Sequence, residues 1–247
     1  MADINRTAYP QFADTYTKSQ LARSFTPSED EIVWVKRNVR SRRMHLGAMT
    51  LLKSFQALRY FPTINSVPAS VVHHIGTAMG MHERLKMGSY SDRTLHRHMK
   101  AIRDYLKVTA YYGNTSFEKV MAFATEAAAV VHERRDIINS IIERLVLDSH
   151  ELPAFSTLEN AAEEAHAQVL GQMYDKVMSR IDSTFCRELD ALLVTDFERR
   201  VSSFNDLKFS AKRLSRQNMD ALIEHLQWLE GIGNIRDVFQ AVPDAKV

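Results

Sequence analysis

The sequence has few of the residues on which many enzymes and secreted domains depend. It has one cysteine, Cys186, which excludes an internal disulfide and a thiolate metal cluster. Eight glycines and six prolines in 247 residues are few, and no glycine-rich phosphate loop occurs among them. No run approaches about 18 apolar residues, and the N-terminal twenty residues lack the apolar segment of a signal peptide. We therefore expect a reduced, cytoplasmic protein without a membrane span.

Catalytic and metal-binding patterns are also missing. Cys186 falls in an amphipathic stretch, where a core position is expected and not a nucleophile. The histidines of the pairs His73-His74 and His96-x-His98 point in different directions on a helix, so neither pair chelates a metal well. We expect no cofactor, no metal and no enzymatic activity of the chain itself.

Helical periodicity is what the sequence does contain. Apolar residues recur at spacings of three and four along almost the whole chain, which predicts an all-α fold. Ser156-Thr-Leu-Glu159 has the S-x-x-E pattern of a capping box and predicts a helix start at Ser156. After an extended N-terminal arm, the helices are expected at 29–39, 42–60, 68–79, 91–107, 116–134, 136–147, 156–182, 184–197 and 216–229.

The formal net charge of +2 is the sum of two unlike parts. Residues 1–113 hold 17 Lys or Arg against 8 Asp or Glu, a net +9, and residues 114–247 hold 15 against 22, a net −7. Gly113-Asn114 is also a turn signal. We therefore expect a boundary there, between a domain of residues 1–113 and a domain of residues 114–247. Such an asymmetry suggests an anionic partner for the first part.

The segment 90–107, YSDRTLHRHMKAIRDYLK, concentrates this positive charge. On a helical wheel its cations share one third of the surface: Arg93, Arg97, Lys100, Arg103 and Lys107. A separate apolar stripe consists of Leu95, Met99, Ile102 and Leu106, and His98 flanks the cations. One face can thus dock on a core while another presents cations to the major groove of DNA.

A solvated, merely solubilising face is the alternative for one basic helix. Asp104 on the same face supports that alternative, because it can neutralise a neighbouring cation. A second basic cluster favours a nucleic-acid partner. Its members are Lys36, Arg37, Arg40, Arg42, Arg43, His45 and Lys53, with no nearby acid in the sequence to balance them.

The order of several short motifs resembles a known family. The motifs are Leu21-Ala-Arg-Ser-Phe25, Arg43-Met-His-Leu-Gly47 with Lys53, Leu58-Arg-Tyr-Phe-Pro62, Val67-Pro-x-x-Val-Val72, Tyr90-Ser-x-Arg93-Thr with His98, Ile102-Arg103-x-Tyr-Leu106 and Leu152-Pro153-x-x-Ser-Thr-Leu158. Together they resemble the N-terminal DNA-binding region of the Tn3-family transposases, the replicative, cointegrate-forming enzymes of bacteria. The resemblance runs from about Leu21 to the end of the chain.

This resemblance implies a function. In that family the N-terminal helical domains recognise the terminal inverted repeats of the transposon, and a downstream ribonuclease-H-like domain performs the DNA chemistry. Nothing here resembles the catalytic domain. We therefore expect an all-α chain of two consecutive helical DNA-binding bundles of helix-turn-helix-like type, followed by the start of a helical connector. The connector from Gly80 to Ser91 is long for the turn of such a motif.

The expected partner is double-stranded DNA, with self-association expected only through a longer parent chain. The expected DNA-binding residues are Arg40, Arg42, Arg43, His45, Lys53, Ser91, Arg93, Thr94, Arg97, His98, Lys100, Arg103, Lys107, Ser156 and Thr157. Among them, Arg93, Arg97 and His98 are the candidates for reading bases. Two alternatives stay open: a helical protein-interaction scaffold that uses the acidic C-terminal part, and a stand-alone regulator of transposition that occupies the repeats without catalysis.

Overall fold

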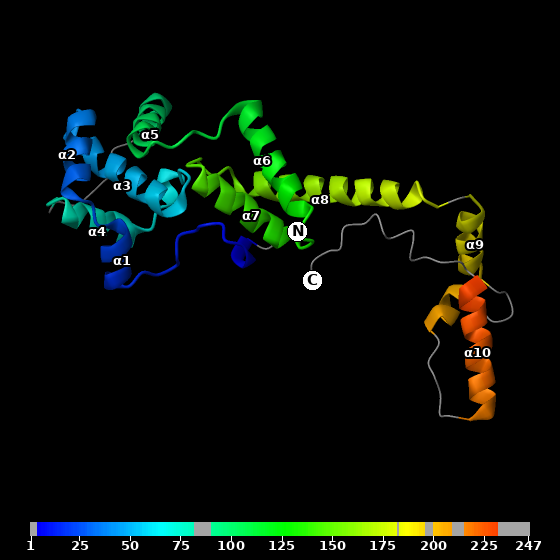
Figure 1. Cartoon of the computed structure of the whole chain (residues 1–247). Helices are drawn as coiled ribbons and strands as arrows, with labels where there is room; N and C mark the ends of the chain where they lie inside the picture. Colours follow the sequence, from blue (N-terminus) through cyan, green and yellow to red (C-terminus); the bar gives the residue numbers. More distant parts are fainter. Residues whose placement is uncertain (1–3, 82–89, 182, 196–199, 209–214, 232–247) are drawn as a thin grey trace. The chain divides into compact units, whose positions relative to one another are not determined.

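A computed structural model describes residues 4–81, 90–181, 183–195, 200–208 and 215–231. Regular structure within these ranges is helical, which confirms the all-α prediction. The α-helices are α1 (Lys18–Phe25), α2 (Glu29–Asn38), α3 (Arg42–Leu58), α4 (Ala69–Ala78), α5 (Asp92–Leu106), α6 (Gly113–Ala128), α7 (Arg134–Leu147), α8 (Phe155–Met178), α9 (Ser183–Leu193) and α10 (Arg216–Gly231) (Figure 1). Short 3-10 helices lie at η1 (Ile4–Arg6), η2 (Ile64–Ser66) and η3 (Ser203–Lys208).

The chain divides into two compact units, Met1–His166 and Ala167–Val247. The division falls inside α8, so the boundary predicted at residues 113 and 114 lies within the first unit. Gly113 does mark a turn, because its φ of +71° is a left-handed conformation that favours glycine. What changes there is the hydrophobic core: helices α1 to α5 share one, and helices α6 to α8 bury a second set of apolar residues.

Side-chain caps set the start of several helices. Ser28 caps α2 in a reciprocal capping box with Glu31, and Ser91 caps α5 by accepting the Thr94 N–H. A third cap starts α1, where Thr17 and Gln20 form a capping box within the segment expected to be an extended arm. The prediction was wrong for α1, although its Thr17-x-x-Gln20 pattern is the sequence signal of such a start.

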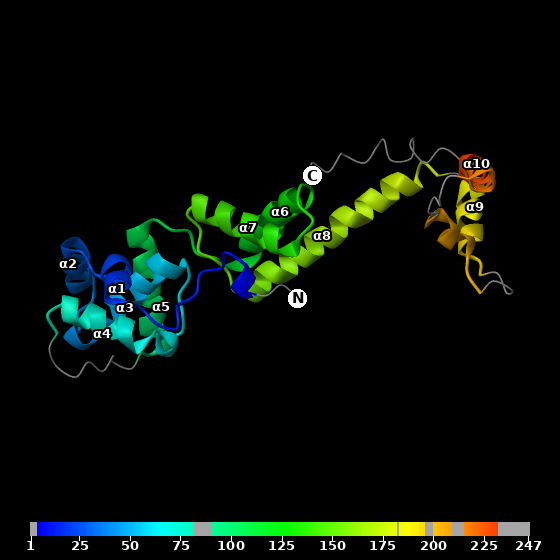
Figure 2. The same ribbon diagram turned by 90° about the horizontal axis from the view of Figure 1, so that it is seen from below.

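Helix α3 lies at the centre of the first core. It contacts α1, α2, α4 and α5 (Figures 1 and 2), and eleven of its 17 residues are buried. Its predicted apolar face of Leu46, Met49, Leu52 and Phe55 is fully inside. Because α3 is covered on several sides, its remaining positions are buried as well, including the polar Lys53.

Helices α6 and α7 pack against each other, and the first half of α8 buries Leu158, Ala161, Ala162 and Ala165. The N-terminal arm connects this part to the rest of the unit. The Ala8 N–H donates to Asn139 Oδ1 at 2.7 Å, and the Tyr9 hydroxyl donates to the Pro153 carbonyl at 2.9 Å. The arm thus links α7 and the start of α8 to the segment that leads into α1.

The second unit contributes no buried residue among those described. Its helix α9 contacts η3, and an isolated bridge joins Thr195 to Ser202. No described helix of the chain has the length and apolar character needed to cross a membrane. In the same described ranges, no group of three or more His, Cys, Asp or Glu side chains converges as a metal site.

Candidate nucleic-acid interface

Helix α5 docks on α3 through one face only. Ile102 is fully buried, and Leu95 and Leu106 pack partly buried against the same core. The opposite face carries four exposed cations at spacings of four, three and seven residues, which we call the basic ridge: Arg93, Arg97, Lys100 and Lys107. The wheel therefore placed these four side chains correctly on the solvent side.

The ridge keeps its charge. Asp104 shares the exposed face, and Asp92 lies in the first turn, where a carboxylate stabilises the helix dipole. Among the ion pairs of the described residues, none joins a ridge cation to a carboxylate. The four cations are therefore available to an external anion.

A second group of exposed cations surrounds the connection between α2 and α3. We call this group the junction cluster: Lys36, Arg37, Arg40, Arg42 and Arg43. His45 lies beside it but is half-buried, and its Nε2 forms a 2.7 Å hydrogen bond with the Val39 carbonyl. His45 thus holds the connection in place, while the arginines on either side of it face solvent.

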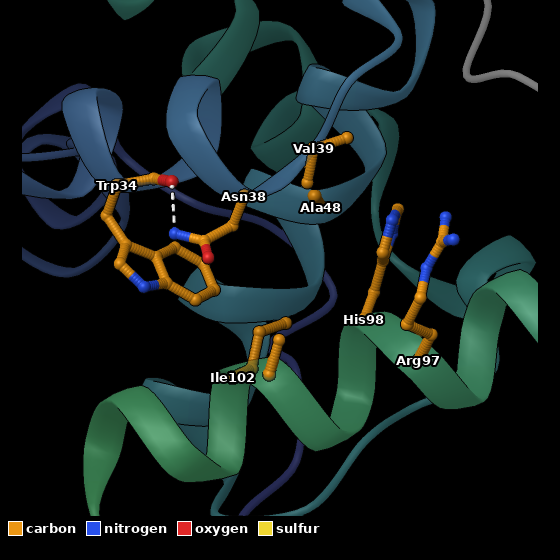
Figure 3. A pocket seen from close by; sticks show the side chains of 8 residues that line it. Trp34, Asn38, Val39, Ala48, Arg97, His98 and Ile102 are labelled. Atoms are coloured by element: carbon orange, nitrogen blue, oxygen red, sulfur yellow. Dashed lines mark hydrogen bonds between the residues drawn. The ribbon is translucent and has the colours of Figure 1, made fainter.

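One ridge residue, Arg97, lines a pocket of about 240 Å³, and Asn38 and Val39, which also line it, directly precede Arg40 of the junction cluster. The end of α2 forms one side of the pocket with Trp34 and Asn38, and α5 forms the other with Arg97 and His98 (Figure 3). In Figure 3, Arg97 and His98 stand side by side on α5 and extend toward α3. The pocket therefore lies beside Arg97 of the ridge and beside the segment that leads into the junction cluster.

His98 was predicted to read bases, and the structure corrects this. Its side chain is only 4% exposed, because the Tyr90 ring packs edge-on against it and the Tyr90 hydroxyl lies 3.3 Å from its Nδ1. Tyr90 fits there because Gly47 of α3 has no side chain: a Cβ on Gly47 would come within 2.6 Å of the Tyr90 hydroxyl oxygen. Burial, and then the charge of Arg97, lower the pKa of His98. Its Nε2 is buried without a hydrogen-bond partner.

Arg103 also lies apart from the ridge. Its guanidinium donates to the Glu151 carboxylate at 2.8 and 3.1 Å and stacks 4.9 Å from the centre of the Phe61 ring. Glu151 also accepts the Tyr111 N–H at 3.3 Å. This bidentate pair joins α5 to the connection between α7 and α8. Arg103 thus forms an ion pair within the protein, in which a carboxylate from the acidic part of the chain neutralises it.

Lys53 is the clearest correction. Its ammonium is buried on α3 and donates to both carboxylate oxygens of Glu31 at 3.3 and 3.4 Å. Glu31 also accepts the Gln56 amide at 2.7 Å and the Ser28 N–H at 2.8 Å. Burial alone would raise the pKa of Glu31, but these hydrogen bonds and the Lys53 charge hold it below its ordinary value. Lys53 therefore belongs to the core and not to the exposed basic surface.

The hydroxyl-bearing candidates fall in two places. Ser91 is exposed at the start of α5, and its hydroxyl lies 3.0 Å from that of the half-buried Thr94, next to Arg93. Ser156 and Thr157 lie instead on α8, which begins at Phe155, so Ser156 is inside the first turn and not at the predicted cap. An ion pair between Arg134 and Glu163 connects α8 to α7.

The start of α8 lies beside α7 and apart from α5 in both views of the chain (Figures 1 and 2). The structure therefore does not bring Ser156 and Thr157 to the basic ridge. It does expose Arg40, Arg42 and Arg43 next to Val39, which lines the same pocket as Arg97 of α5.

Trp34 and Tyr90 shape the site but were not among the residues predicted to bind DNA. Trp34 stacks on Tyr105 of α5 with ring centres 4.6 Å apart and planes 28° apart. A usable signal for Tyr90 was Gly47, since a glycine inside a long helix often marks the close approach of another group.

Comparison with known proteins gives a family for most of this unit. A family model described as "Domain of unknown function (DUF4158)" matches residues 1–165. No curated protein matches the chain. The match covers both helical parts of the first unit, from the N-terminal arm to the first half of α8. Because it spans about two thirds of the sequence, the chain belongs to the DUF4158 family.

Proposed function

We propose that this chain binds double-stranded DNA through the basic ridge and the junction cluster. The observation that supports it most is the exposed face of α5, where Arg93, Arg97, Lys100 and Lys107 stand without a carboxylate partner among the described residues. Arg40, Arg42 and Arg43 are exposed just after Asn38 and Val39, which line the pocket together with Arg97. Cations gathered in this way neutralise phosphates and release counterions, which is the main source of affinity for DNA.

The distribution of acids supports the same assignment. Residues 114–166 contain 4 Lys or Arg and 10 Asp or Glu, so α6, α7 and the start of α8 are acidic and repel a phosphate backbone. Of the carboxylates in this acidic part, Glu151 binds a cation of α5, and that cation is Arg103 on the packed side. The ridge itself is left free for DNA.

The motif order of the sequence narrows the proposal. It resembles the N-terminal region of Tn3-family transposases, so the DNA would be the terminal inverted repeat of a transposon, and the chain would recognise it for a catalytic domain elsewhere. Arg93 and Arg97 would read bases, because arginine pairs with guanine in two parallel hydrogen bonds. Lys100, Lys107 and the junction-cluster residues Arg40, Arg42 and Arg43 would hold the backbone.

Fluorescence anisotropy with a labelled duplex tests the proposal on the full chain. The ridge variant replaces Arg93, Arg97 and Lys100 by glutamine, and we expect it to bind about 100-fold more weakly, at about 5-fold per lost contact. The control variant replaces Arg6, Lys18 and Arg23 by glutamine. It removes the same charge from the arm and from α1, on the other side of α3 from α5 (Figure 1).

Equal losses in the ridge and control variants would show that only net charge matters and would contradict the proposed surface. No binding of the unmodified chain at low salt would favour the scaffold alternative, in which the acidic helices contact another protein. Specificity is measured separately, by comparing binding to the terminal repeat of the mobile element that encodes the chain with binding to random DNA. Arg97→Ala is expected to lose discrimination between that repeat and random DNA, whereas Lys107→Ala weakens binding to both alike.

A further inference from the structure

The pocket between α2, α3 and α5 has a composition that the binding of a regular duplex does not explain. Arg97 belongs both to the basic ridge and to the pocket wall. We propose that this pocket receives one unstacked nucleobase from the DNA that the ridge binds. The inference rests on the proposed function, since the ridge must first hold the backbone beside the pocket.

The inner surface of the pocket is aliphatic. Val39, Ala48, Ala101 and Ile102 contribute to it, and two of these residues, Ala48 and Ile102, are fully buried in the core. A phosphate would lose its hydration against such a surface without gaining a countercharge at depth. No carboxylate lines the pocket, so a hard cation such as Mg²⁺ or Ca²⁺ has no charged ligand there. An uncharged ring with apolar faces suits the pocket.

The walls add aromatic and planar groups. Trp34 is fixed by its stacking on Tyr105, with ring centres 4.6 Å apart. Opposite it stand the planar side chains of Arg97 and His98 (Figure 3). Indole rings and guanidinium planes are the groups on which proteins stack unpaired bases.

Two polar side chains, Asn38 and His98, line the pocket. Asn38 donates from Nδ2 to the Trp34 carbonyl at 2.9 Å, which fixes its carboxamide with Oδ1 and a second N–H directed elsewhere. His98 has a buried Nε2 without a hydrogen-bond partner in the pocket wall. A buried polar atom without a partner is unfavourable, and the ring edge of a base has the donors and acceptors to satisfy it.

The size of the pocket sets the kind of ligand. Its volume of about 240 Å³ is below the roughly 300–1,000 Å³ of sites for drug-sized molecules. One ring system is therefore accommodated, while the sugar and phosphates stay outside. There they lie against the other cations of the basic ridge.

The test compares three labelled duplexes of the same sequence by anisotropy with the full chain. One is fully paired, one carries a single extrahelical thymine, and one carries an abasic residue at that position. The extrahelical base is already unstacked, so we expect about tenfold tighter binding than to the abasic duplex, which bends equally but has no base to insert. Equal affinity for the thymine and abasic duplexes overturns the inference.

Ala101→Leu narrows the pocket without changing any charge, and it is expected to bring the ratio of the two affinities close to one. Ala22→Leu adds the same side chain at an exposed site of α1 and is expected to keep the ratio near ten. A ratio that stays at ten in Ala101→Leu overturns the pocket as the site of the base. Failure to bind any of the three duplexes at low salt contradicts the proposed function itself, which separates the two ideas.

Discussion

Replacing Lys53 by methionine tests whether this buried lysine stabilises the fold, in contrast to the lysines that face solvent. Methionine keeps the length of the side chain and removes the ammonium that donates to Glu31. The two side chains are only 10% and 8% exposed, so water cannot fully replace the lost partner. Removing one partner of a buried ion pair typically costs about 3–5 kcal/mol.

Glu31 retains two hydrogen bonds in the variant, from Gln56 at 2.7 Å and from the Ser28 N–H at 2.8 Å. These bonds reduce the expected loss to about 2–3 kcal/mol, which corresponds to a fall of about 4–12 °C in Tm for a chain of this size. The pH dependence has a definite sign. Hydrogen bonds and the Lys53 charge lower the pKa of Glu31, so the stabilisation is complete above its unfolded pKa and is lost as pH falls through its folded pKa.

Circular dichroism at pH 7 and at pH 3 measures this difference. We expect Lys53→Met to differ clearly from the unmodified chain at pH 7, and the difference to shrink as pH falls through the lowered pKa of Glu31. Lys100→Met is the matched control, since Lys100 is exposed on the ridge. We expect it to change the free energy of unfolding by less than about 0.5 kcal/mol, and hence to leave Tm nearly unchanged. An unchanged Tm in Lys53→Met would refute the buried pair.

Three further variants test the packing around α5. Gly47→Ala places a methyl group within 2.6 Å of the Tyr90 hydroxyl oxygen, and we expect a loss of about 1–3 kcal/mol in urea unfolding that Tyr90→Ala in the same chain relieves. Glu151→Gln weakens the bidentate contact with Arg103 and should cost about 1–2 kcal/mol, measured in the same way. Burial lowers the pKa of His98, so stability should fall as pH drops below about 6.5, and His98→Gln should lose that part of the pH dependence.

The sequence predicted the exposed cations of α5 well for a physical reason. The apolar residues of that segment follow one stripe without ambiguity, so the orientation of the helix on its core was determined locally. Arg93, Arg97 and Lys100 lie opposite that stripe and are exposed. The caps at Ser28 and Ser91 were likewise readable, because a capping side chain bonds within its own first turn.

The predictions for Lys53, Arg103 and His98 were wrong for the opposite reason. Lys53 of α3 pairs with Glu31 of α2, and Arg103 of α5 pairs with Glu151, which follows α7 in the sequence. Partners 22 and 48 residues apart are set by tertiary packing, which helical periodicity does not report. His98 sits at the edge of the apolar stripe, and only the fit of Tyr90 over α3 decides that it is buried.

The most direct test of the central claim is the salt dependence of duplex binding. Arg93, Arg97, Lys100, Lys107, Arg40, Arg42 and Arg43 are the exposed cations assigned to phosphate and base contacts. If each neutralises one phosphate, log Kobs should fall with log salt with a slope of about −6. Glutamine at Arg93, Arg97 and Lys100 should reduce the slope to roughly −4. A slope near zero for the unmodified chain, or the same slope for the unmodified chain and the glutamine variant, would contradict the account.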